Sequence, residues 1–530
     1  MTPGARWARL APMVAAAVPA AVYVIIAPPS RDLAAQLFRA HLFAAQGFGL
    51  WNNLWYSGHD IVGYSILVPA ISAALTPQLA AAAATTATAA VFTPLVARHR
   101  GAAAWPAAVL FGAATAIDLY TGRLALAIGA LPALAAIDAL DRGAPVVAGA
   151  LAVVAALCSP VAALFGALAA AGGALAALVS RRGLRAALPG GGVAVAALAP
   201  VGLLAVAFPE GGTEPFALSA MWPVAALALA LAVLGPGDLP GLRAGAGVYA
   251  LAVLVAYVVP SPVGGNAARL GELLAAPVAA LLWWPDRPRR LAVAALPLLY
   301  LGWQAPVRDV AATAGDPSVT AAYYRPLLAF LTRESGPAVV PFRIEIPFTA
   351  SHWEAWRVAT RFAIARGWER QLDVADNPIF YGGPLTAGRY RRWLAANAVR
   401  FVALPDAALD ASARRERALI LSRPSYLRPV LRTAHWRVYA VAGATPIAGG
   451  AAVLRTLGTD SLTLIARRAG TVTLRVRFSP YWALTEGAGC VSPEGPYTRL
   501  TLRRAGPVVL SMRFARGRIG ATAPRCSSGR

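Results

Sequence analysis

Two acidic residues that follow the first long apolar run are the strongest candidates for chemistry. Asp32 begins a helical pattern that also carries Arg39, and Asp60 follows His59 in an aromatic turn. A carboxylate held beside a hydroxyl group can remove its proton as a general base. The structural alternative for Asp32 is an acid in the first turn of a helix capped by Ser30, where the helix dipole favours a negative charge.

Eleven apolar runs precede residue 305, and a helix that crosses a bilayer needs roughly 20 apolar residues. They cover residues 10–28, 78–97, 102–120, 123–140, 144–159, 161–180, 189–208, 222–236, 244–260, 271–285 and 291–304. We expect a break at Ser159-Pro160, because proline removes a backbone donor and clashes with the preceding turn. The stretch 61–76 is predicted to be re-entrant or interfacial. The sequence thus predicts a polytopic α-helical membrane domain over 1–304, with a long first outer loop at 29–77.

The composition agrees with a membrane protein. Hydrophobic residues make up 58% of the 530 residues, charged residues 14%, and the mean hydropathy is +0.58. These values exclude a disordered chain, a disulfide-rich mini-protein and an ordinary soluble enzyme. The net charge of +24 comes from arginine alone, because the chain has no lysine.

The arginines also predict an orientation. With the N-terminus inside, most arginines of the membrane domain fall in cytoplasmic loops, as the positive-inside rule requires. The chain is then a multi-pass protein of the cytoplasmic membrane, and everything after 304 lies outside. Residues 1–28 could instead be a signal peptide, but they lack a clear small-x-small cleavage site, so we expect an uncleaved helix. A basic region outside the cell argues against a nucleic-acid partner.

The C-terminal region is predicted to hold two extracytoplasmic subdomains. Helix and strand patterns alternate over 305–445, with helices at 318–334, 351–367 and 386–398 and strands at 338–347 and 400–405, which indicates an α/β subdomain. Ser351 and Glu354 fit a capping box for the second helix. Short runs of period two over 446–530 predict an antiparallel β-sandwich. In an oxidising compartment we expect Cys490 and Cys526 to pair, the alternative being two free thiols.

The first outer loop and the architecture together resemble a known superfamily. A short first helix, a long outer loop with an early Asp, about eleven spans and an extracytoplasmic C-terminal domain resemble the type-C glycosyltransferases, which use polyprenyl-phosphate sugars. More narrowly, the chain is similar to bacterial membrane proteins labelled 6-pyruvoyl-tetrahydropterin-synthase-related. The residues that carry this likeness are Asp32, His41, Trp51-Asn52, Trp55-Tyr56-Ser57-Gly58-His59-Asp60, Tyr64, Pro69, Gly264-Gly265-Asn266-Ala267-Ala268-Arg269-Leu270 and Arg366-Gly367-Trp368-Glu369-Arg370-Gln371.

The resemblance implies transfer of a sugar from a polyprenyl-phosphate donor to an envelope glycan or lipid acceptor at the outer membrane surface. Asp32 or Asp60 would be the base. Arg269 would hold the donor phosphate, with Asn266, Arg39 and His59 beside it. The alternatives for Arg269 are contact with lipid headgroups or pairing with Glu272. The alternative for His59 is a hydrogen-bonding role in the loop. The sequence leaves the cofactor open: a divalent cation, Mg²⁺ or Mn²⁺, could bridge Asp32 and the phosphate, and no metal-ligand cluster stands out.

Acceptor binding has its own candidates, each with a structural alternative. Trp55 and Tyr56 could stack on a sugar, or could be interfacial aromatics beside membrane lipids. His352 and Glu354 could face the acceptor, or could cap and pack a helix. Asn377 and Tyr381 lie in a loop that could line an acceptor groove. The candidates for acceptor binding are therefore Trp55, Tyr56, His352, Glu354, Asn377 and Tyr381.

Two other functions remain open from the sequence. One is a non-enzymatic envelope protein that binds or hands over lipid-linked glycans. The other is a transporter, which would usually place polar groups and broken helices near the membrane midplane. Apart from the cytoplasmic set, the ionisable residues of the membrane half gather instead at the outer face, which suggests a site at the outer membrane surface. A membrane glycosyltransferase is therefore the leading hypothesis.

Overall fold

The computed structural model describes residues 3–336 and 339–527, which form two compact units. The first unit comprises Met1–Gln36, Tyr64–Leu204 and Thr213–Thr313, and the second comprises Leu37–Gly63, Ala205–Gly212 and Ala314–Arg530. Two loops from the early part of the chain, 37–63 and 205–212, thus belong with the C-terminal region.

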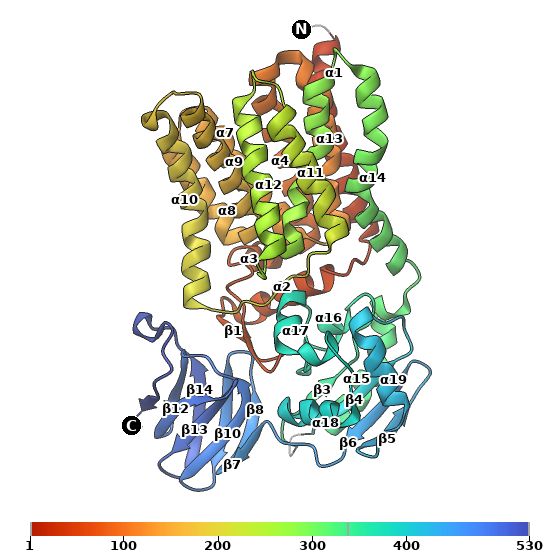
Figure 1. Cartoon of the computed structure of the whole chain (residues 1–530). Helices are drawn as coiled ribbons and strands as arrows, with labels where there is room; N and C mark the ends of the chain where they lie inside the picture. Colours follow the sequence, from red (N-terminus) through yellow and green to blue (C-terminus); the bar gives the residue numbers. More distant parts are fainter. Residues whose placement is uncertain (1–2, 337–338, 528–530) are drawn as a thin grey trace. The chain divides into compact units, whose positions relative to one another are not determined.

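Helices that run side by side make up the first unit (Figure 1). They are α1 (Pro3–Ile26), α3 (Val68–Leu75), α4 (Pro77–Arg100), α5 (Trp105–Ala114), α6 (Ala116–Tyr120), α7 (Leu124–Asp141), α8 (Pro145–Cys158), α9 (Pro160–Val179), α10 (Leu184–Ala207), α11 (Leu218–Leu234), α12 (Pro240–Val258), α13 (Arg269–Trp283) and α14 (Pro288–Thr313). Each predicted apolar run coincides with helix. Among the described residues, five helices are long and apolar enough to cross a membrane, namely α4, α7, α9, α10 and α12. The count of eleven spans stays a prediction.

The expected break between α8 and α9 is confirmed. Helix α8 ends at Cys158 and α9 begins at Pro160, with the Ser159 hydroxyl accepting a hydrogen bond from the Ala162 N–H at 3.3 Å. A serine cap followed by proline at the first helical position is a strong start signal, because proline has no N–H to leave unsatisfied.

Large apolar side chains cover the outside of several helices. Val195 and Leu203 of α10 are 66% and 71% exposed, Leu229 of α11 is 57% exposed and Val258 of α12 is 73% exposed. Inside the bundle, mostly alanine packs against alanine, which lets helices approach closely. An apolar exterior of this extent fits a surface that faces lipid rather than water.

Helix α2 (Leu33–Gln46) is shared between the two units, its first residues belonging to the first and the rest to the second. Asp32 directly precedes this helix, so the expectation that it lies in the first helical turn was wrong by one position. A short antiparallel pair, β1 (Trp51–Asn52) and β2 (His59–Asp60), follows in the second unit.

The α/β part of the second unit is built on a four-stranded sheet in the order β3-β4-β6-β5. The strands are β3 (Arg343–Glu345), β4 (Val399–Pro405), β5 (Leu427–Arg432) and β6 (Trp436–Val441), and the helices are α15 (Ala321–Glu334), α16 (Glu354–Arg357), α17 (Arg370–Asp376), α18 (Ala387–Ala396) and α19 (Arg414–Leu421). The predicted helices at 318–334 and 386–398 are confirmed, the latter capped by Thr386, and so is the strand at 400–405. The strand predicted at 338–347 is confined to Arg343–Glu345 among the described residues.

The helix predicted at 351–367 was wrong. Only Glu354–Arg357 is helical, and Ser351 does not cap it. His352 has a φ of 58°, and the Glu354 carboxylate accepts hydrogen bonds from the Thr349 N–H and hydroxyl at 3.2 and 2.6 Å. These contacts fix the chain in turns, so tertiary packing overrides the local capping pattern.

Residues 446–527 form the predicted antiparallel β-sandwich. One sheet has the order β15-β12-β13-β10-β7 and the other β11-β14-β9-β8. The strands are β7 (Ala448–Gly450), β8 (Ala452–Leu457), β9 (Ser461–Ala466), β10 (Gly470–Arg477), β11 (Trp482–Glu486), β12 (Gly489–Glu494), β13 (Tyr497–Leu502), β14 (Gly506–Met512) and β15 (Arg525–Ser527). Cys490 and Cys526 are paired residues of β12 and β15, and the structure joins them in a disulfide, as the sequence predicts.

Candidate functional site

Six charged residues of the first unit interact where helices begin and end, and we call them the bundle-end cluster. Asp32 precedes α2, Asp309 lies in the last turns of α14, and the other four come from the α6–α7 connection and the start of α13. The members are Asp32, Asp118, Arg123, Arg269, Glu272 and Asp309, which interact electrostatically with one another.

A glycine turn holds two parts of this cluster together. Gly122 links α6 to α7 with a φ of 76°, in the left-handed region that favours glycine. A Cβ atom added to Gly122 would lie 2.2 Å from the Ser30 Oγ and 2.8 Å from the Leu33 nitrogen. The turn that leads to Arg123 therefore packs directly on the turn that carries Asp32.

Two guanidinium groups serve this site differently. Arg123 donates a hydrogen bond to Glu272 at 2.8 Å. Arg269 interacts electrostatically with Asp32 and Asp118, yet it has no hydrogen bond or ion pair to another side chain within the described part of the chain. The predicted alternative of an Arg269–Glu272 pair is not formed, because Glu272 pairs with Arg123. Arg269 therefore keeps its guanidinium hydrogen-bond donors from the acids of the cluster, unlike Arg123.

Two polar side chains adjoin these charges. Gln36 donates a hydrogen bond to the Tyr64 hydroxyl at 2.8 Å, and Tyr64 also interacts with Arg269. Asn266, predicted beside the donor phosphate, lies in the turn before α13 and donates to its own turn through the Pro262 carbonyl at 3.3 Å. The bundle-end cluster therefore offers carboxylates for proton transfer and a guanidinium for a phosphate within one unit.

In the second unit, Asp60 and Glu210 form a separate pair of acidic residues beside His59. The Glu210 carboxylate accepts a hydrogen bond from the Asp60 N–H, and Glu210 Oε2 lies 3.5 Å from His59 Nδ1. Burial, and then the Glu210 charge, raises the pKa of Asp60 well above its usual value, and burial raises that of Glu210 in the same way. Burial lowers the pKa of His59. Both shifts favour the protonated carboxyl groups over the carboxylates.

The remaining loop candidates are packed inside the second unit. Arg39 is 6% exposed and pairs with Glu369. Trp55 is fully buried, stacks on Phe38 and donates its indole N–H to the Ala355 carbonyl at 3.2 Å. Tyr56 also bonds to the backbone of Glu369. These contacts favour the structural alternatives for Arg39, Trp55 and Tyr56.

The four acceptor candidates of the α/β part lie in a buried polar network. His352 stacks on Trp368, and Asn377 donates to Asp373 at 2.9 Å. Burial raises the pKa of Glu354 to about 8. Tyr381 donates to Asp373 at 2.5 Å. Three of the four are buried, so the structure gives them packing and hydrogen-bonding roles rather than an open groove: His352, Glu354 and Asn377 are at most 1% exposed.

Arg366 is the centre of that network. It makes two hydrogen bonds to Asp373, at 3.0 and 2.6 Å, and its guanidinium lies between the rings of Phe348 and Phe380, 3.8 and 4.0 Å from their centroids. Glu416 and Glu345 approach its Nη1 at 3.4 and 3.9 Å. Burial raises the pKa of Glu416 to about 7 and that of Glu345 well above its usual value, so this pair holds a proton at neutral pH.

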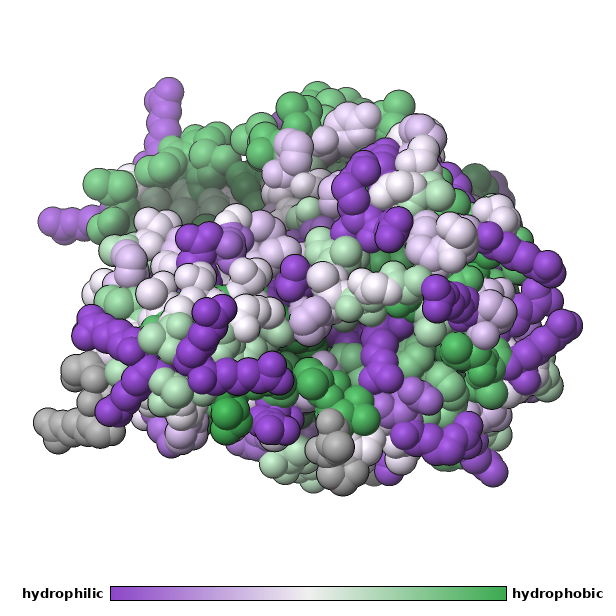
Figure 2. Space-filling model, turned by 90° about the horizontal axis from the view of Figure 1, so that it is seen from below, coloured by the Kyte–Doolittle hydropathy of each residue, from purple (hydrophilic) through white to green (hydrophobic). Residues whose placement is uncertain are grey.

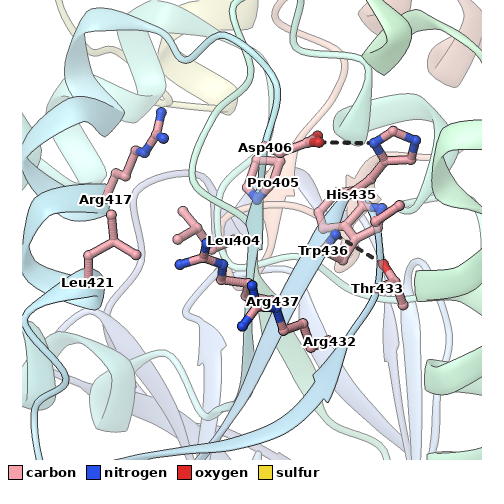
Figure 3. A pocket seen from close by; sticks show the side chains of 11 residues that line it. Leu404, Pro405, Asp406, Arg417, Leu421, Arg432, Thr433, His435, Trp436 and Arg437 are labelled. Atoms are coloured by element: carbon pink, nitrogen blue, oxygen red, sulfur yellow. Dashed lines mark hydrogen bonds and ion pairs between the residues drawn. The ribbon is translucent and has the colours of Figure 1, made fainter.

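A pocket of the α/β part lies between α19 and the β5–β6 strands. Figure 3 shows Arg417 and Leu421 coming from the helix and Arg432 and Arg437 from the strands. Asp406, at the rim, pairs with His435 at 3.0 Å. No predicted site residue lines this pocket.

The residues that the structure describes hold no group of three or more His, Cys, Asp and Glu side chains arranged to bind a metal ion. The bundle-end acids interact mainly with arginines, which already supply the positive charge that a cation would bring.

The predicted donor site is therefore divided. Asp32, Asn266 and Arg269 belong to the first unit, whereas Arg39, His59 and Asp60 belong to the second. Sequence reasoning missed Asp309, because hydropathy falls after residue 304 although α14 continues to Thr313. Three other members of the cluster could be recognised in the sequence, because they are charged residues beside predicted outer loops: Asp118, Arg123 and Glu272.

Comparison with protein-family models finds no match to the chain, and comparison with curated proteins finds none either.

Proposed function

We propose that the protein is a membrane glycosyltransferase that moves a sugar from a polyprenyl-phosphate donor to a cell-envelope acceptor. The observation that carries the proposal is the joint environment of Asp32 and Arg269 in the bundle-end cluster. It combines a carboxylate with a guanidinium group that interacts with it electrostatically, in a unit whose helices have membrane character. The sequence resemblance to type-C enzymes points to the same chemistry.

The reaction that these groups suit is a single displacement at the anomeric carbon. The acceptor oxygen forms a bond to that carbon while Asp32 takes the hydroxyl proton. The bond from the carbon to the phosphate oxygen breaks, and the polyprenyl phosphate leaves with the electron pair. Arg269 stabilises the charge that develops on the leaving phosphate, because a guanidinium matches phosphate oxygens in a bidentate manner. No step requires a metal ion.

Asp32 suits the role of base better than Asp60. Burial and then Glu210 raise the pKa of Asp60, which favours its protonated form, and a protonated carboxyl group cannot take the proton of an acceptor hydroxyl. The backbone N–H of Asp60 donates to Glu210, and we assign this residue to the structure of its loop.

The test is a transfer assay with the full chain in lipid nanodiscs, using a panel of polyprenyl-phosphate pentoses and hexoses with extracted envelope glycan as acceptor. We expect Asp32→Asn to lose about 100- to 10,000-fold in transfer rate, the usual contribution of a general base. Asp238→Asn is the matched control, because this side chain is 67% exposed and forms only a 3.7 Å pair with Arg100. Full activity in Asp32→Asn would refute the proposal, and donor binding without transfer in the wild type would support the non-enzymatic alternative.

Sidedness is part of the proposal. The second unit and the bundle-end cluster would lie on the outer side of the cytoplasmic membrane. Alkaline phosphatase fused after residue 530 should be active, whereas a fluorescent protein that matures only in the cytosol should stay dark at the same position. The reverse pattern would contradict transfer at the outer surface of the membrane.

A further inference from the structure

The β-sandwich contains an internal repeat. Residues 461–478 read SLTLIARRAGTVTLRVRF and residues 497–514 read YTRLTLRRAGPVVLSMRF, so that half of the aligned positions are identical. Each copy consists of two consecutive strands that belong to different sheets, β9–β10 and β13–β14, and the central Arg-Arg-Ala-Gly falls at the connection between them each time. The repeat thus gives the sandwich two equivalent turns.

Burial separates the structural part of the repeat from the rest. The identical leucine and valine positions are buried in both copies, which packing explains: Leu464 and Leu500, Val472 and Val508, and Leu474 and Leu510. Among the positions that are exposed in both copies, some differ in residue type: Ile465 corresponds to Thr501, and Thr471 to Pro507. The exposed turn residues Arg-Arg-Ala are identical in the two copies. Packing does not explain why exposed arginines are kept where their exposed neighbours differ.

Strand register brings the two turns together. Ala466 pairs with Gly506 between β9 and β14, and Gly470 pairs with Leu502 between β10 and β13. Paired residues of antiparallel strands have Cα atoms about 5 Å apart. The turns 467–469 and 503–505 therefore lie next to each other at one end of the sandwich, and we call them the arginine tip.

The arginine tip carries four positive charges on two adjacent turns. Its arginines are exposed, and among the described residues their side chains have no hydrogen bond or ion pair: Arg467, Arg468, Arg503 and Arg504. Like charges held this close repel one another, so an anionic ligand that bridges them gains energy from each. Figure 2 shows how hydrophilic side chains project from one face of the molecule.

We propose that the arginine tip is a binding site for a soluble, linear polyanion that carries phosphate groups. Guanidinium groups bind phosphate oxygens in a bidentate way, and four of them on two adjacent turns suit successive phosphates of one chain. Ala469 and Ala505 are the only other side chains between the strands in these turns, so the tip lacks the aromatic or large aliphatic residue that would anchor it in a bilayer. A polymer is therefore the favoured occupant over a lipid surface.

The experiment measures binding of fluorescent linear polyphosphate to the full chain in phosphatidylcholine nanodiscs by anisotropy, over a series of salt concentrations. Replacing all four tip arginines with serine should weaken binding at low salt by roughly tenfold or more and reduce the slope of log affinity against log salt by roughly three. The matched control replaces four other exposed arginines of the same unit with serine, which changes the net charge equally: Arg391, Arg392, Arg432 and Arg437.

Each outcome bears on the proposal. Loss of binding in the tip variant with retention in the control supports a dedicated site. Equal loss in both variants would show attraction by net charge only, and would overturn it. Binding to vesicles rich in phosphatidylglycerol that depends on the tip, without binding to polyphosphate, would also overturn it in favour of a lipid surface. The double variants Arg467→Ser/Arg468→Ser and Arg503→Ser/Arg504→Ser should each lose part of the affinity, because the two turns act together.

Discussion

Replacing Arg366 with methionine should destabilise the second unit strongly, because it leaves buried acids without their cation. Arg366 is 1% exposed, and Asp373, Glu345 and Glu416 all lie around it with no more exposure. Removing one partner of a buried charge pair costs about 3–5 kcal/mol. The loss of two hydrogen bonds to Asp373 and of stacking between two rings falls within that range, so we expect about 4 kcal/mol.

Urea unfolding followed by pulse proteolysis measures this effect in the full chain, because fragments report where the chain has opened. With an m-value of about 2 kcal/mol per molar urea, 4 kcal/mol lowers the midpoint for the second unit by about 2 M. Arg366→Lys should fall between wild type and methionine, since lysine keeps the charge but not the bidentate geometry. Adding Asp373→Asn to Arg366→Met should recover part of the loss.

Arg361→Met is the control, because Arg361 is exposed nearby in the sequence and surface changes usually stay within about 0.5 kcal/mol. If the Arg366→Met midpoint coincides with that of Arg361→Met, the buried acids do not depend on Arg366. The reasoning about the network would then be wrong.

Three further predictions follow from local geometry. Burial raises the pKa of Glu354 to about 8, so its ionisation disfavours the folded state. Wild type should lose stability as pH rises from about 4.5 through 8, and in urea titrations Glu354→Gln should lose less, by up to about 5 kcal/mol at pH 9, whereas parallel pH curves would contradict this. Gly122→Ala should lower the melting temperature in detergent more than Gly143→Ala, because both glycines have φ near 75° but only the Gly122 site lacks space for a Cβ; equal shifts would mean that the Ser30 contact is unimportant. The Cys490→Ser/Cys526→Ser variant should lose about 4 kcal/mol in the second unit, since the disulfide closes a loop with a sequence separation of 36, and a midpoint that is equal to wild type in urea would show that the bond contributes nothing.

Sequence patterns predict much of this fold where local periodicity and local signals coincide. The Ser159-Pro160 break needs only a cap and a proline, and the strands of the sandwich follow period-two alternation. The helix predicted at 351–367 does not form, because Glu354 accepts a hydrogen bond from Thr349 and the chain turns at His352. Neither feature can be read from a local sequence pattern.

The candidate site was predictable in part for a similar reason. Asp32 and Arg269 stand out as charged residues at the edges of apolar runs, and edges on the same side of a membrane can meet. Their actual neighbours depend on which helices pack together, as Arg123 and Glu272 demonstrate by pairing across 149 positions of the sequence. Burial raises the pKa of Asp60, and Glu210, 150 positions away in the sequence, raises it further.

The availability of a cation separates the two acidic regions as sites for a phosphate-linked donor. In the second unit, Arg39 is buried and committed to Glu369, so an incoming phosphate would have to displace a carboxylate from a buried pair, which is costly. In the first unit, Arg123 compensates Glu272 and leaves Arg269 able to bind an anion beside Asp32. Transfer from a phosphate requires positive charge where the leaving group develops its own, and this requirement favours the bundle-end cluster as the place where the proposed reaction occurs.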